Sequence, residues 1–153
     1  MLEIGSTPTL ALTDTEGHDV AVADHRGEDS VYIYFMRALS CAQCNAHVQN
    51  MVKNKADFDA ANVTVLIAVP EEPVDAASWK AKRDIPFTVV IGKEGTAHAE
   101  VGLLRKVFGA LQQSGSILLD QNGVVRYTHA STNPVTSYNR TEVAAAIADL
   151  TSS

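Results

Sequence analysis

The residues best suited to covalent chemistry are the only two cysteines of the chain, Cys41 and Cys44, which stand at C-x-x-C spacing. Because they are neighbours, they cannot join distant segments, so no disulfide framework is implied. In a reducing compartment a lone C-x-x-C pair is typical of a redox-active or a metal-binding site. The structural alternative is that both cysteines are small apolar residues packed where a strand meets a helix.

The elements expected around the pair favour redox chemistry. Residues 31–35 form an apolar run rich in β-branched and aromatic side chains, which predicts a buried strand. A helix over residues 41–58 is expected next, because apolar side chains recur on one helical face: Cys44, Val48, Met51 and Val52. This arrangement places Cys41 at the helix N-terminus and Cys44 one turn inside the helix.

The helix N-terminus predicts different roles for the two sulfurs. Free backbone N–H groups carry partial positive charge there, and Arg37 precedes Cys41 by four residues. Both favour a thiolate, so we expect the pKa of Cys41 to lie below its usual value of about 8.5. We therefore predict Cys41 as the nucleophile, Arg37 as the residue that stabilises its thiolate, and Cys44 as the shielded partner that closes a disulfide.

The remaining pattern predicts one α/β domain over residues 1–153. The apolar run 63–69 stops at Pro70 and completes a strand–helix–strand crossover, which is typical of a parallel sheet. Asn122-Gly123 between apolar runs predicts a closing hairpin. Toward the N-terminus we expect a hairpin or two short strands within 9–22 and a loop over 24–30. After Pro70 we expect a helix that opens with residues 71–73 and runs to about 82, then a strand over 87–91 and one or two short helical pieces within 96–111. The chain should close with hairpin strands over 116–119 and 124–129, a loop over 130–138, and a last helix that opens with the capping pair Asn139 and Glu142.

Composition limits the classes of function. The 153 residues carry a net charge of −6, so the chain lacks the general basic surface that nucleic acid requires. No apolar run approaches the ~20 residues of a membrane helix, and the first residues lack the pattern of a signal peptide. We therefore expect a cytoplasmic protein that binds neither nucleic acid nor a membrane.

The order of the elements resembles the thioredoxin-like fold, and some segments resemble peroxiredoxins in particular. These segments are the lead-in 12–17, residues 78–87 and the closing hairpin 117–127. Most specifically, Phe35-Met36-Arg37 followed by Cys41 and Cys44 resembles the F-x-R-x-x-x-C-x-x-C signature of the peroxiredoxin-like branch of the alkyl hydroperoxide reductase/thiol-specific antioxidant superfamily. The resemblance implies a three-layer sandwich, with a mixed central sheet flanked by helices and an N-terminal β-hairpin extension.

The resemblance also implies a function. A peroxiredoxin-like thiol peroxidase would use Cys41 to attack a peroxide, Cys44 to close a disulfide, and Arg37 to orient the substrate. Its partners would be the peroxide, a thioredoxin-type or low-molecular-weight thiol reductant and, as in many relatives, a second copy of the chain in a homodimer. Neither a cofactor nor a metal is expected for this chemistry.

Three positions depart from the peroxiredoxin pattern P-x-x-x-[T/S]-x-x-C. Counting back from Cys41, Tyr34 stands at the proline position and Ala38 at the position of the hydroxyl residue. Ser114 precedes the expected strand 116–119, where the family has a second arginine. Peroxide cleavage requires donors around the thiolate. The departures therefore leave two alternatives open: a thiol–disulfide oxidoreductase acting on disulfide substrates, and a redox sensor or binding domain without turnover.

For the other conspicuous residues we expect mainly structural roles. His47 extends the pair to C-x-x-C-x-x-H, but the sequence offers no second C-x-x-C to complete the four ligands of a zinc site. We expect His47 on the helix surface, where it is also a candidate proton carrier for Cys44. Tyr127 and His129 alternate on the closing hairpin, with one edge facing the site. The residues expected in the core are Tyr32, Tyr34, Trp79 and Phe87, and those expected as solvated charges are Arg83, Arg126 and Arg140.

Overall fold

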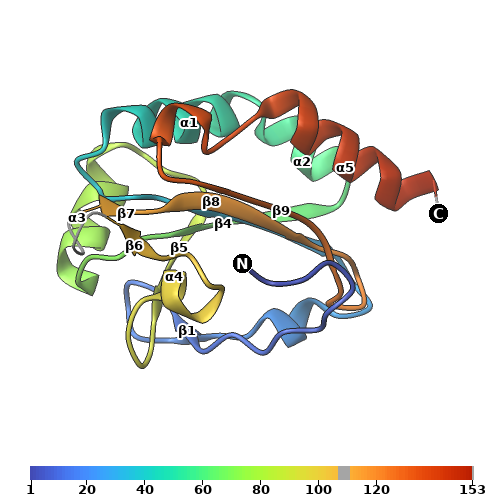
Figure 1. Ribbon diagram of the computed structural model, residues 1–153, viewed down its shortest axis with the longest axis horizontal. Helices are drawn as coiled ribbons and strands as arrows, with labels where there is room; N and C mark the ends of the chain where they lie inside the picture. Colours follow the sequence, from blue (N-terminus) through green and yellow to red (C-terminus); the bar gives the residue numbers. More distant parts are fainter. Residues whose placement is uncertain (107–110, 153) are drawn as a thin grey trace.

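The computed structural model describes residues 1–106 and 111–152, which form three layers with a sheet in the middle (Figure 1). The sheet has seven strands in the order β2-β1-β5-β4-β3-β8-β9. These strands are β1 (Leu12–Thr13), β2 (Asp19–Val20), β3 (Ser30–Phe35), β4 (Val63–Ala68), β5 (Thr88–Gly92), β8 (Ser114–Leu119) and β9 (Val125–Ser131). The predicted fold class, a thioredoxin-like mixed α/β sandwich, is confirmed.

Helices cover both faces of the sheet. The α-helices are α1 (Ala42–Lys53), α2 (Lys55–Ala60), α3 (Pro73–Lys82), α4 (Ala97–Glu100) and α5 (Arg140–Ser152), and the 3-10 turns are η1 (Val22–His25) and η2 (Pro134–Thr136). Figure 1 shows α1, α2 and α5 on one face of the sheet, while α4 and the N-terminal segment lie on the other. No described helix combines the length and the apolar character needed to cross a membrane.

Strand β3 lies at the centre of the sheet, parallel to β4 and antiparallel to β8. All of its side chains are buried, as expected for a strand covered on both faces. Successive side chains enter different cores: Tyr32 and Tyr34 pack in the core that includes α1, α3 and α5, and Ile33 and Phe35 pack in the core on the α4 side. The predicted burial of these tyrosines is confirmed.

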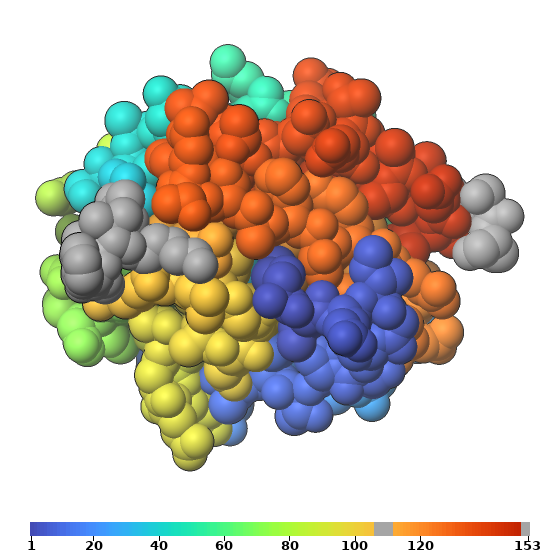
Figure 2. Space-filling view, in the orientation of Figure 1, coloured from blue at the N-terminus to red at the C-terminus, as the bar shows by residue number. Residues whose placement is uncertain are grey.

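The N-terminal segment forms much of the second face. Figure 2 shows this segment (blue) packed against the yellow segment that contains α4. β1 pairs with both β2 and β5, and the Ala11 N–H donates to the Glu100 carboxylate at 2.9 Å. The predicted N-terminal hairpin is confirmed, and it extends the central sheet at its edge.

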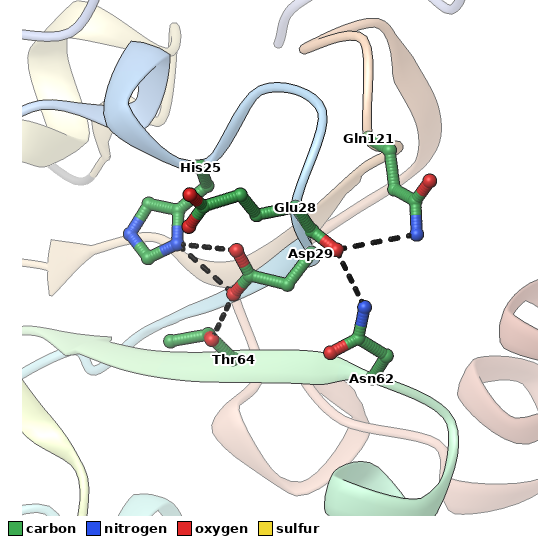
Figure 3. Close-up of polar contacts among 6 residues, drawn as sticks. All are labelled: His25, Glu28, Asp29, Asn62, Thr64 and Gln121. Carbon is green, nitrogen blue, oxygen red and sulfur yellow. Dashed lines mark hydrogen bonds and ion pairs between the residues drawn. The ribbon is translucent and has the colours of Figure 1, made fainter.

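A polar cluster closes the amino ends of β3 and β4 (Figure 3). The Asp29 carboxylate accepts a hydrogen bond from the Thr64 hydroxyl and lies 2.9 Å from His25 Nδ1. The Glu28 carbonyl oxygen accepts from Asn62 Nδ2 at 2.6 Å. The cluster therefore joins η1, the start of β3 and the start of β4; its members are His25, Glu28, Asp29, Asn62, Thr64 and Gln121.

Two predicted segments differ from the observed ones for local reasons. The predicted helix 41–58 is divided at Asn54, whose side-chain amide donates to the Asn50 carbonyl oxygen at 2.7 Å and competes with helical backbone bonding. Within the predicted segment 96–111, α4 is the expected short helix. The ladder of β6 (Arg105–Lys106) and β7 (Leu111–Gln112) was not predicted, and residues 107–110 lie outside the described part.

Candidate active site

The two cysteines lie where the carboxyl end of β3 leads into α1. Cys41 is the N-cap residue of α1, as the sequence predicted, and it forms a disulfide with Cys44 across a Cα–Cα distance of 5.3 Å. Cys44 is completely buried, whereas Cys41 retains 4% exposure. Cys41 is therefore the member of the pair that a reagent in solution reaches first.

Backbone N–H groups donate to both sulfurs. The Cys44 N–H donates to Cys41 Sγ at 3.2 Å, and the Arg37 N–H donates to Cys44 Sγ at 3.4 Å. Such donors favour negative charge on sulfur. A thiolate released from either cysteine when the disulfide opens therefore has a donor in place.

Arg37 lies beside the pair through its backbone. It is half-buried, and among the described residues its guanidinium group takes part in no hydrogen bond or ion pair. The guanidinium is thus not committed to another side chain in this part of the molecule. The predicted role of its charge at Cys41 stays a prediction.

Asn45 fixes the loop that carries Cys41. Its Nδ2 donates to the carbonyl oxygens of Leu39 and Cys41 at 2.8 and 2.9 Å. Its Oδ1 accepts from Trp79 Nε1 at 2.8 Å, which links the loop to α3. The predicted burial of Trp79 is confirmed, but the role of Asn45 was missed. The sequence signal that could have indicated this role is a polar residue next to Cys44, four positions after Cys41.

Glu71 holds the same loop from the segment that follows β4. Its Oε2 accepts the Leu39 N–H at 2.8 Å. Its Oε1 is buried and has no hydrogen-bond partner among the described residues. A buried oxygen without a partner destabilises a fold, so such an atom on the residue that holds the Cys41 loop points to a functional role. The sequence indicated Glu71 only as a residue that opens the next helix.

His98 supports the backbone just before the loop. Its Nε2 lies 2.6 Å from the Met36 carbonyl oxygen, and its ring meets the edge of Phe35 with centroids 5.3 Å apart. Burial lowers the pKa of His98 to about 4, so the ring is neutral at pH 7 and donates through Nε2. Nδ1 has no partner among the described residues. Sequence reasoning missed His98, which lies in the segment where the helical pattern was weakest.

Ser114 has a structural contact at the position where the resemblance expects an arginine. Its hydroxyl donates to the Phe35 carbonyl oxygen at 2.6 Å and so holds the end of β3. The neighbouring Tyr34 hydroxyl lies 2.7 Å from Ser137 Oγ, and burial raises the pKa of Tyr34. Ala38 is half-buried and brings no hydroxyl to the loop.

His47 is half-buried and contacts η2 and two tyrosines. Its Nε2 lies 2.9 Å from the Pro134 carbonyl oxygen, and its ring packs against Tyr34 and Tyr138 with centroid distances of 6.2 and 5.6 Å. His47 therefore keeps part of its surface exposed on α1, while η2 covers the rest of this helical turn. No described hydrogen bond joins His47 to Cys44.

The remaining candidates lie apart from the cysteine loop. Tyr127 donates to Glu142 at 3.1 Å, and His129 lies 2.5 Å from the Thr136 carbonyl oxygen, so both bond to the closing segments. The three arginines predicted as solvated are exposed: Arg83, Arg126 and Arg140. Among the described residues, one set of three metal-ligand atoms lies within 4.8 Å, and it comprises Asp14, Glu16 and His18 of the β1–β2 turn.

A strand–helix–strand unit with a cysteine disulfide capping its helix defines a thiol-based protein of the thioredoxin-like class. The AhpC/TSA family model matches residues 5–128, and the chain belongs to this family. The family assignment agrees with the predicted resemblance.

Individual relatives are distant. The chain is 25% identical over 81% of its length to a putative chloroplastic peroxiredoxin Q of Oryza sativa subsp. indica, and it covers 57% of that protein, little more than half. It is 27% identical over 79% of its length to a putative peroxiredoxin of Mycobacterium tuberculosis, of which it covers 72%. The crystal structure of peroxidoxin BcpB from Mycobacterium tuberculosis superposes with a TM-score of 0.83 at 15% identity, covering 98% of this chain and 99% of the other. This likeness shows the fold.

Proposed function

We propose that the chain is a peroxiredoxin-like thiol peroxidase with Cys41 and Cys44 as its redox pair. The observation that carries the proposal is the disulfide at the N-terminus of α1, with a backbone N–H donor on each sulfur. Membership of the AhpC/TSA family and likeness to proteins named peroxiredoxins support it. The proposal includes a peroxide substrate, a thioredoxin-type or low-molecular-weight thiol reductant, a homodimer, a cytoplasmic location and a single domain over residues 1–153.

In the proposed cycle the Cys41 thiolate attacks one oxygen of the peroxide. The O–O bond breaks, water or an alcohol leaves, and Cys41 becomes a sulfenic acid. The Cys44 sulfur then attacks the Cys41 sulfur, the S–O bond breaks, and the oxygen leaves as water when the disulfide forms. A thiol reductant returns two electrons and two protons. Arg37 stabilises the Cys41 thiolate and orients the peroxide through its guanidinium group.

Rapid mixing of the reduced protein with hydrogen peroxide, and separately with an organic hydroperoxide, tests the proposal. We expect oxidation much faster than that of a free low-molecular-weight thiolate at the same pH, ending in an intramolecular disulfide seen by mass spectrometry. Cys44→Ser should stop at the sulfenic acid, because the chain has no other cysteine to resolve it. Rates no faster than the free thiolate with both oxidants would contradict the peroxidase function.

A thiol–disulfide oxidoreductase is the second candidate, and the residues at two positions favour it. Ala38 brings no hydroxyl to the site, and the Ser114 hydroxyl is already bonded to the Phe35 carbonyl oxygen. Peroxide cleavage would thus have fewer donors than the family pattern supplies. Rapid reduction of insulin disulfides combined with slow peroxide oxidation would favour this function. A reversible disulfide without activity in either assay would favour a redox sensor.

A further inference from the structure

One peptide group connects the two faces of the sheet at the cysteine site. Cys44 packs in the core on the α1 side, whereas His98 lies on α4, which Figure 1 shows on the opposite face. The peptide group between Met36 and Arg37 follows the end of β3. Its carbonyl oxygen lies 2.6 Å from His98 Nε2, and its N–H donates to Cys44 Sγ at 3.4 Å. His98 is therefore linked to one sulfur of the pair through a single peptide group.

The two hydrogen bonds of this peptide group act in the same direction. A carbonyl oxygen only accepts, so His98 Nε2 carries the proton and donates to Met36. Donation to the carbonyl oxygen polarises the peptide group and makes its N–H a stronger donor. Hydrogen bonds in such a chain strengthen one another by about 10–30%. The bond from His98 thus strengthens the bond from the Arg37 N–H to the sulfur.

Cys44 depends on this one donor. It is completely buried, and within the described part of the chain no other group donates a hydrogen bond to its sulfur. Burial disfavours a thiolate, whereas a hydrogen bond to the sulfur favours it. The strength of the Arg37 N–H bond therefore influences how readily Cys44 becomes a thiolate.

The burial of His98 also calls for an explanation. The residue is completely buried, and Nδ1 has no hydrogen-bond partner among the described residues. A buried imidazole with one unsatisfied nitrogen lowers the stability of a fold. The compensating contact is the bond from Nε2 to the Met36 carbonyl oxygen, the acceptor that leads to Cys44.

We propose that His98 is a positioning residue that stabilises the Cys44 thiolate through the Met36–Arg37 peptide group. The inference rests on the proposed redox function of the pair. When a reductant thiolate attacks the more accessible Cys41 sulfur, the S–S bond breaks and its electron pair leaves with Cys44, faster if that thiolate is stabilised. A second reductant thiolate then attacks the mixed disulfide and releases Cys41 as a thiolate. Two reductant thiols become one disulfide, and the two cysteines gain two electrons and two protons.

The test measures the acid dissociation of the Cys44 thiol in the full-length chain carrying Cys41→Ser, by the ultraviolet absorbance of the thiolate against pH. Adding His98→Leu should lower the dissociation constant about two- to fivefold, because the Arg37 N–H becomes a weaker donor. In the chain that keeps both cysteines, His98→Leu should also slow the opening of the disulfide by 2-mercaptoethanol, by a smaller factor.

Two amide variants separate the hydrogen bond from the shape of the imidazole. His98→Gln should restore both quantities, because its amide nitrogen reaches about as far as Nε2 and can donate to Met36. His98→Asn should behave like His98→Leu, since its amide ends near the level of Nδ1. His98→Asn also provides the comparison if His98→Leu does not fold.

Ser114→Ala is the matched control, because the Ser114 hydroxyl donates to the Phe35 carbonyl oxygen, one peptide group before the one that reaches Cys44. It should lower stability and leave the dissociation constant unchanged. A constant unchanged by both His98→Leu and His98→Asn, or shifted equally by Ser114→Ala, would overturn the role of His98. A parent protein that is inert toward peroxide but shows the His98-dependent shift would support this role and contradict only the peroxidase function.

Discussion

The two ends of the β3–β4 pair use polar side chains in different ways. At the amino end, side chains bond to one another: the Asp29 carboxylate bonds to both the His25 ring and the Thr64 hydroxyl (Figure 3). At the carboxyl end, polar side chains bond mainly to the backbone of one loop, as Asn45 and Glu71 do at Leu39. The amino end is thus a closed network, whereas the carboxyl end is a scaffold around a segment of backbone.

The carboxyl end also retains buried polar atoms without partners, and the amino-end cluster does not. Glu71 Oε1 and His98 Nδ1 are such atoms, and both residues hold the backbone that leads to Cys41. Unpaired buried atoms lower stability. The comparison indicates that the amino end contributes stability, while the carboxyl end gives up part of it to hold the reactive pair in position.

The largest effect is expected from substituting the cysteines at the carboxyl end. Cys41→Ser should abolish fast oxidation by peroxide, whereas Cys44→Ser should keep the first oxidation step. Because Cys41 is the more accessible of the two cysteines and caps the helix N-terminus, the protein that retains only Cys41 should also react faster with iodoacetamide below neutral pH. Alkylation rates measured against pH check this, and faster reaction of the protein retaining only Cys44 would reverse the assigned roles.

The next effect concerns His98 and pH. Burial lowers its pKa from 6.5 to about 4, so between these values the unfolded chain binds a proton that the folded chain does not. The free energy of unfolding should therefore fall as pH drops through this window, by up to about 3 kcal/mol from this residue. Urea unfolding at several pH values would measure the slope.

His98→Gln supplies the comparison for that slope. The amide can still donate to the Met36 carbonyl oxygen but does not titrate, so this variant should lose less stability than the parent between pH 6.5 and 4. Carboxylates with lowered pKa values, such as Asp14 and Asp120, contribute the same pH dependence to the free energy of unfolding of both proteins. Identical slopes in the two proteins would refute the role assigned to His98.

A smaller effect is expected at the amino end. Asp29→Asn weakens the contacts to His25 and Thr64, so it should lower the free energy of unfolding by about 1–2 kcal/mol. It should leave the rate of Cys41 oxidation unchanged, since the cluster lies at the far end of β3. Asp19→Asn is the control, because its ion pair with Lys93 is exposed and should contribute little. Equal losses of stability in the two variants would show that the amino-end cluster contributes no more than an exposed ion pair.

The smallest effect concerns the acceptor for Leu39. Glu71→Ala removes a single hydrogen bond worth about 1 kcal/mol, so peroxide oxidation should slow by no more than about fivefold. Glu71→Gln keeps an acceptor oxygen and should restore most of the rate. Stopped-flow oxidation measures both, with the exposed Glu72→Ala as control. An equally slow Glu71→Gln would show that charge, and not loop position, is what Glu71 supplies.

Each element that positions the site has one dominant sequence pattern, so these elements could be predicted. An apolar run predicted β3, and the run that stops at Pro70 predicted β4. Helix α3 ends at Lys82 as predicted but begins at Pro73, two residues after the predicted opening at Glu71, because proline suits the first helical position. The capping pair at the last helix is also confirmed, since the Glu142 N–H donates to Asn139 Oδ1 at 3.0 Å.

The contacts around the cysteines could not be predicted, because they join residues that are far apart along the chain. Glu71 reaches Leu39, and His98 reaches Met36, across 32 and 62 residues. Nothing in the local pattern distinguishes these side chains from solvated ones. The β6–β7 ladder was not predicted for another reason: strands of two residues are too short to show an alternating pattern.

The alternation along β3 limits which changes of length the chain tolerates. Adding or removing one residue within the strand would exchange the side chains of its two cores and turn the following loop toward the opposite face. Adding two residues would keep the faces but carry the helix start about 6.6 Å beyond the end of β4. Natural variants of this segment should therefore differ by substitution, and length changes should gather in turns such as the one after β1.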